Sequence, residues 1–118
     1  MCGISGIFSF SSEQSVDGEL LKSMNRAQSH RGPDDEGYYL APGVALGHRR
    51  LSIIDLSGGH QPIFNEDGSV AIVFNGEIYN HKAVKSELET LGHTFASHSD
   101  TETIVHAWEE WGVDCLVH

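Results

Sequence analysis

Hydrophobic residues recur along the chain at two spacings, and each spacing predicts a different kind of element. Near the amino terminus, apolar residues from Ile4 to Phe10 alternate with Gly and Ser, which predicts a short strand that other backbone can approach closely. After Asp17, which is expected to cap a helix, apolar residues recur at the helical repeat of about 3.6 residues. The residues on this predicted core face are Leu20, Leu21, Met24 and Ala27.

The middle of the chain predicts strands joined by tight turns. Residues 37–40 and 44–46 flank Ala41-Pro42-Gly43 and predict a hairpin, whose second strand is expected to continue to Ile54. Asp67-Gly68 predicts a second hairpin turn. The strand expected after it, at 70–74, is nearly continuous in apolar residues, which is typical of a strand buried on both faces.

The last third of the chain predicts helices with recognisable ends. Asn80 is expected to cap a helix that Gly92 ends and that packs through Val84, Leu88 and Leu91. A short strand is expected at 94–96, and Ser99-Asp100-Thr101-Glu102 has the pattern of a capping box that opens another helix. That helix is expected to end at Gly112 and to direct inward Ile104, Val105, Trp108 and Trp111. Residues 113–118 read as the start of a further element.

Composition narrows the classes of function. The 118 residues suffice for one domain with a single core. A formal net charge of −10 argues against nucleic acid or an anionic membrane as a main partner. No apolar run reaches membrane-spanning length, no secretory signal is seen, and the two cysteines have no metal-type pairing, so we expect a cytoplasmic protein with no disulfide framework and no metal site. His93 and His98 come nearest to ligand spacing, and without a second pair we expect both at the surface.

Cys2 is the first candidate for chemistry. Once Met1 is removed, this residue carries an easily activated thiol together with a free α-amine, which is a usable base at neutral pH. Nucleophile and base then sit on one residue, as in hydrolases that use their own terminal amine. The alternative is a small buried thiol at the start of a strand.

Two arginine-containing segments are the next candidates. His30-Arg31-Gly32-Pro33-Asp34 suits no regular element, and it is either an ordinary turn or an ordered loop that Arg31 holds in place. Arg49 and Arg50 are adjacent in a predicted strand, so their side chains point to opposite faces. An inward guanidinium needs a carboxylate partner, which a ligand can supply. The alternative is a pair of surface arginines whose charged heads reach solvent.

Two further candidates follow from strand and helix ends. The side-chain amide of Asn75 and the backbone N–H of Gly76 can converge on one point, as an oxyanion hole requires, although Asn-Gly is also a common turn dipeptide. Asp100 lies in the first turn of a predicted helix. Its carboxylate either favours the helix dipole or meets an ammonium group.

Taken together, five ordered motifs resemble one family, the glutaminase domain of glutamine-dependent asparagine synthetases, a class II glutamine amidotransferase. The motifs are Met1-Cys2-Gly3-Ile4, His30-Arg31-Gly32-Pro33-Asp34, Arg50-Leu51-Ser52-Ile53-Ile54-Asp55, Phe74-Asn75-Gly76-Glu77-Ile78-Tyr79-Asn80 and Ser99-Asp100-Thr101-Glu102. The resemblance covers essentially the whole chain. It implies an α+β, N-terminal-nucleophile hydrolase fold, in which antiparallel sheets are sandwiched between helical layers.

The resemblance also implies a role for each matching residue. Cys2 is the nucleophile and its α-amine the base, while Asn75 and Gly76 form the oxyanion hole. Arg50 binds the α-carboxylate of glutamine, and Asp100, helped by Glu77 and by backbone near Gly76, binds its α-ammonium group. Ile53 and Ile54 line the pocket, and Arg31 orders the loop beneath Cys2. The glutaminase step needs no cofactor.

The family's domain runs beyond residue 118, so the resemblance implies that residues 1–118 are a partial amidotransferase domain without its last strands. A synthetase domain that uses ATP and Mg²⁺ to amidate aspartate is the implied partner and ammonia acceptor. Uncovered strand edges leave a homodimer open as one way to complete the core. Three alternatives stay open: a non-catalytic remnant that binds glutamine, one that binds a partner domain, and an amidotransferase for another ammonia acceptor. Retained Met1 acylates the Cys2 amine and removes the base.

Overall fold

The computed structural model describes residues 1–11, 15–52 and 59–118. Within these ranges the chain forms three α-helices, five strands and one 3₁₀ helix, so the α+β class is confirmed. It divides into two compact units, each described by itself. The first unit runs from Met1 through the third strand and includes His60–Pro62 and Val73–Asn75, whereas the second includes Ile63–Ile72 and Gly76–His118.

The first unit is built on an antiparallel sheet. Its strands β1 (Gly3–Phe8), β2 (Asp35–Ala41) and β3 (Val44–Arg50) lie in the order β1-β3-β2. The predicted hairpin is confirmed, because β2 and β3 meet at a turn where Gly43 adopts a φ of 78°. β3 ends at Arg50, so the expected continuation to Ile54 is wrong for residues 51 and 52; Ile53 and Ile54 lie outside the described residues.

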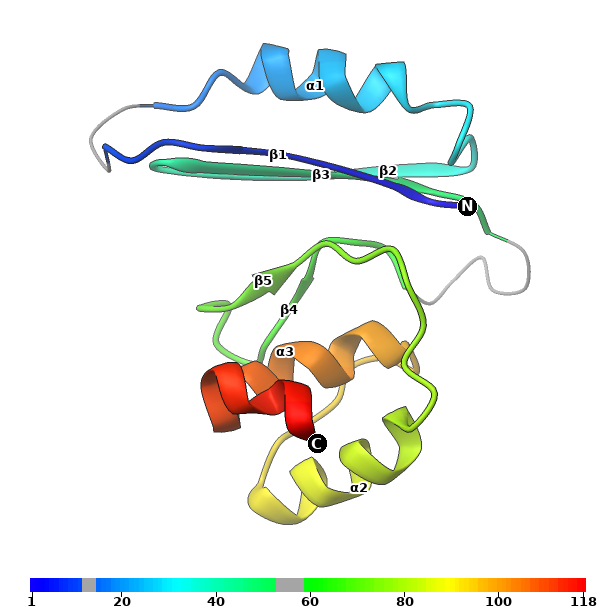
Figure 1. The fold of residues 1–118 in the computed structure, drawn as a ribbon, viewed down its shortest axis with the longest axis vertical. Coiled ribbons are helices and arrows are strands. Elements are labelled where there is room, and N and C mark those ends of the chain that lie inside the picture. The colour runs from blue at the N-terminus through cyan, green and yellow to red at the C-terminus, as the bar shows by residue number, and fades with distance from the viewer. Residues whose placement is uncertain (12–14, 53–58) are drawn as a thin grey trace. The chain divides into compact units, whose positions relative to one another are not determined.

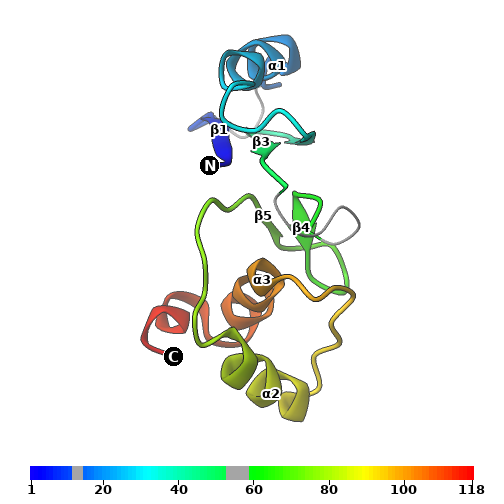
Figure 2. The ribbon, with the colours of Figure 1, turned by 90° about the vertical axis from the view of Figure 1, so that its right-hand side faces the viewer.

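Helix α1 (Gly18–Ala27) covers one face of this sheet (Figures 1 and 2). Asp17 caps it as predicted, since Oδ1 accepts hydrogen bonds from the N–H groups of Glu19 and Leu20 at 2.9 and 3.2 Å. Leu21 is fully buried, whereas Leu20 is half exposed and does not belong to the core face. The buried amide of Asn25 donates to the carbonyl of His48 at 3.1 Å, which ties the helix to the centre of the sheet.

The second unit is organised around helix α3 (Asp100–Trp111), which lies between a short hairpin and helix α2 (His81–Leu91) in both Figure 1 and Figure 2. The hairpin pairs β4 (Ile63–Phe64) with β5 (Ala71–Ile72). A 3₁₀ helix, η1 (Gly112–Val117), packs on α3 and forms the element expected after Gly112. The buried apolar residues of this unit are Val84, Leu88, Val105 and Ala107.

Helix ends lie where the sequence predicts them, but two of the expected side-chain capping bonds do not form. Gly92 ends α2 in the left-handed region at a φ of 106°, and Gly112 ends α3. Asn80 occupies the N-cap position of α2 as predicted, but its side chain makes no capping bond, because its amide donates to the carbonyl of His118 at 2.9 Å. Only half of the predicted capping box forms. Ser99 Oγ accepts from the N–H of Thr101, whereas Glu102 binds the N–H groups of Ala96 and Ser97.

Three expectations about apolar segments are wrong. The predicted strand 70–74 reduces to Ala71–Ile72, and its residues are only partly buried, because in the part of the chain that is described this strand pairs with β4 alone. Residues 94–96 form no strand, since their backbone binds carboxylates of Glu66 and Glu102. Trp108 does not point inward and is 47% exposed.

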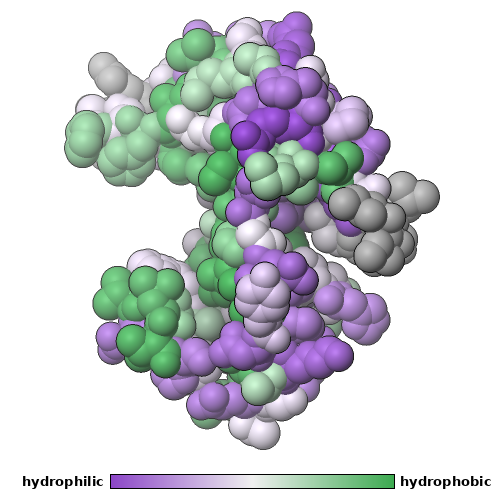
Figure 3. Space-filling view, turned by 45° about the vertical axis from the view of Figure 1, so that its right-hand side comes forward, coloured by the Kyte–Doolittle hydropathy of each residue, from purple (hydrophilic) through white to green (hydrophobic). Residues whose placement is uncertain are grey.

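Apolar side chains reach the surface of both units, as the green areas of Figure 3 show. The most exposed large ones are Phe10, Tyr79, Leu116, Val117 and Met1. Every helix in the ranges 1–11, 15–52 and 59–118 is too short or too polar to cross a lipid bilayer. The sandwich of sheets between helical layers stays a prediction.

Candidate functional site

Cys2 lies immediately before β1, beside the end of β3, and is half-buried. The N–H of Leu51 donates to its sulfur at 3.4 Å, and the same sulfur lies 4.0 Å from the Leu51 carbonyl oxygen. The thiol is therefore fixed at one end of the sheet by backbone groups.

Arg31 holds the backbone of the same residue. Its Nε donates to the Cys2 carbonyl at 3.1 Å. The loop that carries Arg31 is ordered rather than an ordinary turn, because the N–H of Asp34 donates to the Arg50 carbonyl at 3.0 Å and the Asp34 carboxylate accepts from the N–H of Ser52 at 2.7 Å. Gly32 is required in this loop, since a Cβ there would overlap the backbone of Arg49.

The two adjacent arginines occupy different environments. Arg49 is the buried one, at 9% exposure, and it pairs with Glu36 while its Nε donates to the Gly32 carbonyl at 2.8 Å. Its charge is therefore matched within the protein, and it does not await a ligand. Arg50 is less buried and is paired in register with Asp35. Burial acts to raise the pKa of Asp35, but a hydrogen bond with His60, the N–H of Glu36 and the charges of His60 and Arg50 hold it below its usual value.

The remaining predicted site residues lie in the segment after β5 and at the start of α3. Asn75, Gly76 and Glu77 are exposed. Asp100 is half-buried and accepts a hydrogen bond from the N–H of Ile78 at 2.7 Å, so it anchors the segment that follows Glu77. Asn75 belongs to the first unit, and the other three to the second. Among the described residues, hydrogen bonds connect Arg31 to Cys2 and Ile78 to Asp100. The catalytic and binding roles of the site residues stay predictions.

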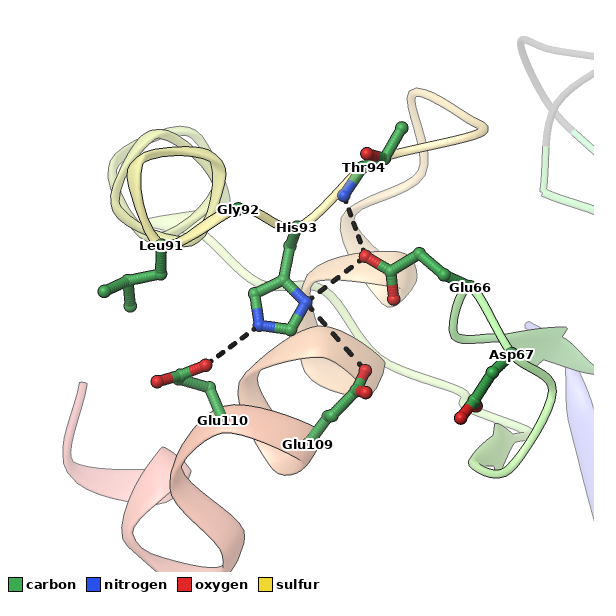
Figure 4. A pocket seen from close by; sticks show the side chains of 8 residues that line it. All are labelled: Glu66, Asp67, Leu91, Gly92, His93, Thr94, Glu109 and Glu110. Atoms are coloured by element: carbon green, nitrogen blue, oxygen red, sulfur yellow. Dashed lines mark hydrogen bonds and ion pairs between the residues drawn. The ribbon is translucent and has the colours of Figure 1, made fainter.

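A cluster of histidines and glutamates in the second unit was not anticipated. The expectation that His93 lies at the surface is wrong: its side chain is only 10% exposed and contacts Glu66, Glu109 and Glu110 (Figure 4). His98, by contrast, is exposed as expected. Burial acts to raise the pKa of Glu66, but the Thr94 N–H and the charges of His106 and His93 lower it to about 2. The one local signal is the i, i+4 spacing of Glu102 and His106 on a helix.

Comparison with known proteins identifies a domain family. The chain matches the family model described as a glutamine amidotransferase domain over residues 1–118. It is 47% identical over 115 residues to glutamine-hydrolyzing asparagine synthetase 2 of Bacillus subtilis (strain 168), covering 96% of this chain and 15% of that protein. It is 43% identical over 119 residues to a probable glutamine-hydrolyzing asparagine synthetase of Dictyostelium discoideum, covering 100% and 21%.

A plant protein shows the same relationship. Glutamine-hydrolyzing asparagine synthetase 1 of Arabidopsis thaliana is 40% identical to this chain over 114 residues, covering 97% of this chain and 19% of that protein. The chain thus corresponds to at most 21% of the length of these three relatives. The similarity consequently concerns one domain of a much longer protein.

Proposed function

This chain belongs to the glutamine amidotransferase domain family, and from that membership we propose that it hydrolyses the side-chain amide of glutamine with Cys2 as nucleophile. The observation that carries the proposal is the double anchoring of Cys2, whose sulfur accepts from the N–H of Leu51 and whose carbonyl accepts from Arg31. A nucleophile lowers the activation barrier most when its position is fixed before the substrate binds. A cysteine with only a packing role needs no such attachment.

The proposed reaction begins after removal of Met1, a residue that is 77% exposed and so accessible to an aminopeptidase. The freed α-amine of Cys2 takes the thiol proton, and the thiolate attacks the amide carbon. The tetrahedral intermediate collapses, the C–N bond breaks, and ammonia leaves with the proton. Water then attacks the γ-glutamyl thioester, which yields glutamate and restores the thiol. The balance is glutamine plus water to glutamate plus ammonia.

The binding roles in this proposal come from the family resemblance. The Asn75 amide and the Gly76 N–H stabilise the oxyanion, and the loss of one such donor typically costs about 10²–10³ in kcat. Arg50 binds the α-carboxylate, and Asp100 with Glu77 binds the α-ammonium group. Arg49 is not assigned to the substrate site, because its guanidinium group already binds Glu36 and the carbonyl of Gly32.

The fate of the ammonia is part of the same proposal. Because the relatives are named asparagine synthetases, we propose that the ammonia passes to a synthetase domain that amidates aspartate with ATP and Mg²⁺. The glutaminase step uses neither of these. A different ammonia acceptor is the alternative. Identifying the product that the full-length protein forms from ammonia distinguishes aspartate from another acceptor.

The proposal is tested by measuring glutamate release together with the amino-terminal mass. We expect processed protein to release glutamate, and Cys2→Ala to abolish this release without lowering Tm. Cys115→Ala is the matched control, because Cys115 is also half-buried and free but packs on the core of the second unit. Full activity in Cys2→Ala contradicts the mechanism. Glutamine binding without turnover in protein that has lost Met1 favours the non-catalytic alternative.

A further inference from the structure

Three segments of the second unit bring histidines and glutamates to one place. Glu66 comes from the turn between β4 and β5, His93 from the segment after α2, and His106 and Glu109 from α3. One potential ligand atom from each of the four lies within 4.8 Å of the other three. The cluster borders a surface cavity of about 410 Å³, shown in Figure 4. Residues far apart in sequence thus form one set of metal-type donors.

Both imidazoles are held by carboxylates at the same ring nitrogen. Nε2 of His106 lies 3.4 Å from Oε1 of Glu102, and Nε2 of His93 lies 3.1 Å from Oε2 of Glu110. Glu102 is itself fixed by the N–H groups of Ala96 and Ser97 at 2.6 and 2.7 Å. A carboxylate that accepts from Nε2–H leaves the lone pair on Nδ1, which is the arrangement found behind metal-binding histidines.

The two Nδ1 atoms face further carboxylates. Nδ1 of His106 lies 3.1 Å from Oε2 of Glu66, and Nδ1 of His93 lies 3.3 Å from Oε1 of Glu66 and 3.9 Å from Oε2 of Glu109. His106 is fully buried, and its Nδ1 makes no hydrogen bond within the described structure. A lone pair directed at a carboxylate oxygen is repulsive unless a cation lies between them. The cluster therefore favours a positive charge at its centre, either a proton on Nδ1 or a bound cation, and the convergence of four donors from three segments points to a bound cation.

We propose that Glu66, His93, His106 and Glu109 bind one divalent transition-metal ion, with Zn²⁺ best matched by two imidazoles and two carboxylates. Tetrahedral zinc with bonds of about 2.0–2.2 Å places its donor atoms about 3.4 Å apart, so the most widely separated pair in the cluster must approach by roughly 1.4 Å. Glu66 and Glu109 are each 36% exposed and can rotate to make this approach. Such an ion links the hairpin, the segment after α2 and α3. Its role is structural and is independent of the proposed glutaminase.

Zn²⁺ titration in competition with a chromophoric chelator tests the site in the whole chain. Cys2→Ala/Cys115→Ala protein is used as background, so that thiols take no part in binding. We expect one Zn²⁺ per chain and a rise in Tm on its addition. His93→Gln and Glu109→Gln are the informative variants, because both side chains reach the cavity surface, whereas His106 is buried and its replacement risks misfolding.

Glu110 only orients His93, so Glu110→Gln should weaken Zn²⁺ binding by about 10–100-fold. His93→Gln and Glu109→Gln should each weaken it by more than this. Glu89→Gln on α2 is the matched control and should bind as the parent does, since Glu89 pairs only with Lys85 at 4.0 Å among its described contacts. The proposal is overturned if binding is not stoichiometric, or if His93→Gln and Glu109→Gln bind Zn²⁺ like the parent. Stabilisation by acid alone, without a response to Zn²⁺, also overturns it.

Discussion

Nε of Arg31 donates a hydrogen bond of 3.1 Å to the carbonyl oxygen of Cys2. Arg31 lies in the loop after α1, and that loop is tied to the end of β3 through Asp34 and the Arg50 carbonyl. The residue proposed as nucleophile is consequently held by two segments that the sequence places far apart. Small shifts in the loop are transmitted to the backbone of Cys2.

Replacing Arg31 should therefore affect turnover more than substrate binding. We expect Arg31→Ala to lower kcat for glutamine hydrolysis by up to about 10²-fold, because a misplacement of about 1 Å has effects of this size. KM should change little, since Arg31 contacts Cys2 and not the proposed ligand groups. Steady-state glutaminase kinetics measure both values. Arg26→Ala, an exposed arginine of α1, is the control and should leave kcat unchanged.

Arg49 and Arg50 should separate into a stability phenotype and a binding phenotype. Arg49→Ala removes the buried partner of Glu36, whose own side chain is 48% exposed, and leaves the Gly32 carbonyl without its donor, so we expect a loss of about 1–3 kcal/mol in the free energy of unfolding. Arg50→Ala should instead raise KM for glutamine strongly with a small effect on stability, because it removes the proposed partner of the α-carboxylate. Urea unfolding and glutaminase kinetics are measured on both. The opposite pattern shows that the substrate arginine has been misassigned.

Asp100 has a structural contact that must be kept apart from its proposed binding role. Its carboxylate accepts from the N–H of Ile78 at 2.7 Å. Asp100→Asn keeps an acceptor oxygen for this bond but removes the negative charge. We expect this variant to raise KM for glutamine with Tm nearly unchanged, whereas Asp100→Ala should lower Tm as well. An unchanged KM in Asp100→Asn excludes Asp100 as the partner of the ammonium group.

Elements with local signals were predicted well from the sequence. Asp17, Gly92 and Gly112 mark helix ends through bonds and dihedral angles within a few residues of themselves, so neighbouring residue types suffice to identify them. The same holds for the turns at Gly43 and Gly68, which both adopt positive φ. The prediction of a strand at 70–74 buried on both faces failed, because apolar residues indicate burial but do not indicate which element packs against them.

Features that depend on long-range contacts were not predicted. The alternation of side chains along a strand predicts that Arg49 and Arg50 point to opposite faces of the sheet. Only the position of Glu36 on β2 determines that Arg49 is the buried one. His93 has an ordinary sequence context, and its burial follows from its contacts with Glu66 and the acidic residues of α3. Such contacts join three elements, and no single stretch of sequence carries a signal for them.

Gly37 should be the most sensitive glycine of the first sheet. A Cβ at this position would overlap the carbonyl of Gln61, whose side chain in turn accepts from the N–H of Phe74 at 2.6 Å. We expect Gly37→Ala to lower the free energy of unfolding by about 1–3 kcal/mol, as overpacking of buried sites does. Gly18→Ala is the control, because its Cβ would make an ordinary 3.4 Å contact with Leu40. Equal unfolding midpoints of the two variants in urea contradict the expectation.

His48 should make stability depend on pH. It is 1% exposed, and this burial lowers its pKa below the ordinary value of 6.5. The unfolded chain then binds the proton at a higher pH than the folded chain does. The contribution of His48 is therefore complete above pH 6.5 and is lost as the pH falls towards the folded-state pKa. We expect the urea midpoint to decrease over this range.

The effect of His48 is isolated by comparing variants, because other histidines and carboxylates titrate in the same range. His48→Gln cannot bind the proton, so its urea midpoint should fall less steeply than that of the parent below pH 6.5. His98→Gln alters an exposed histidine and should keep the slope of the parent. Parallel slopes for the parent and His48→Gln mean that the buried imidazole is not what couples stability to pH. The pH dependence of stability then arises from other paired groups, of which Asp35 and His60 are the first to test, because Oδ2 of Asp35 lies 2.7 Å from Nδ1 of His60.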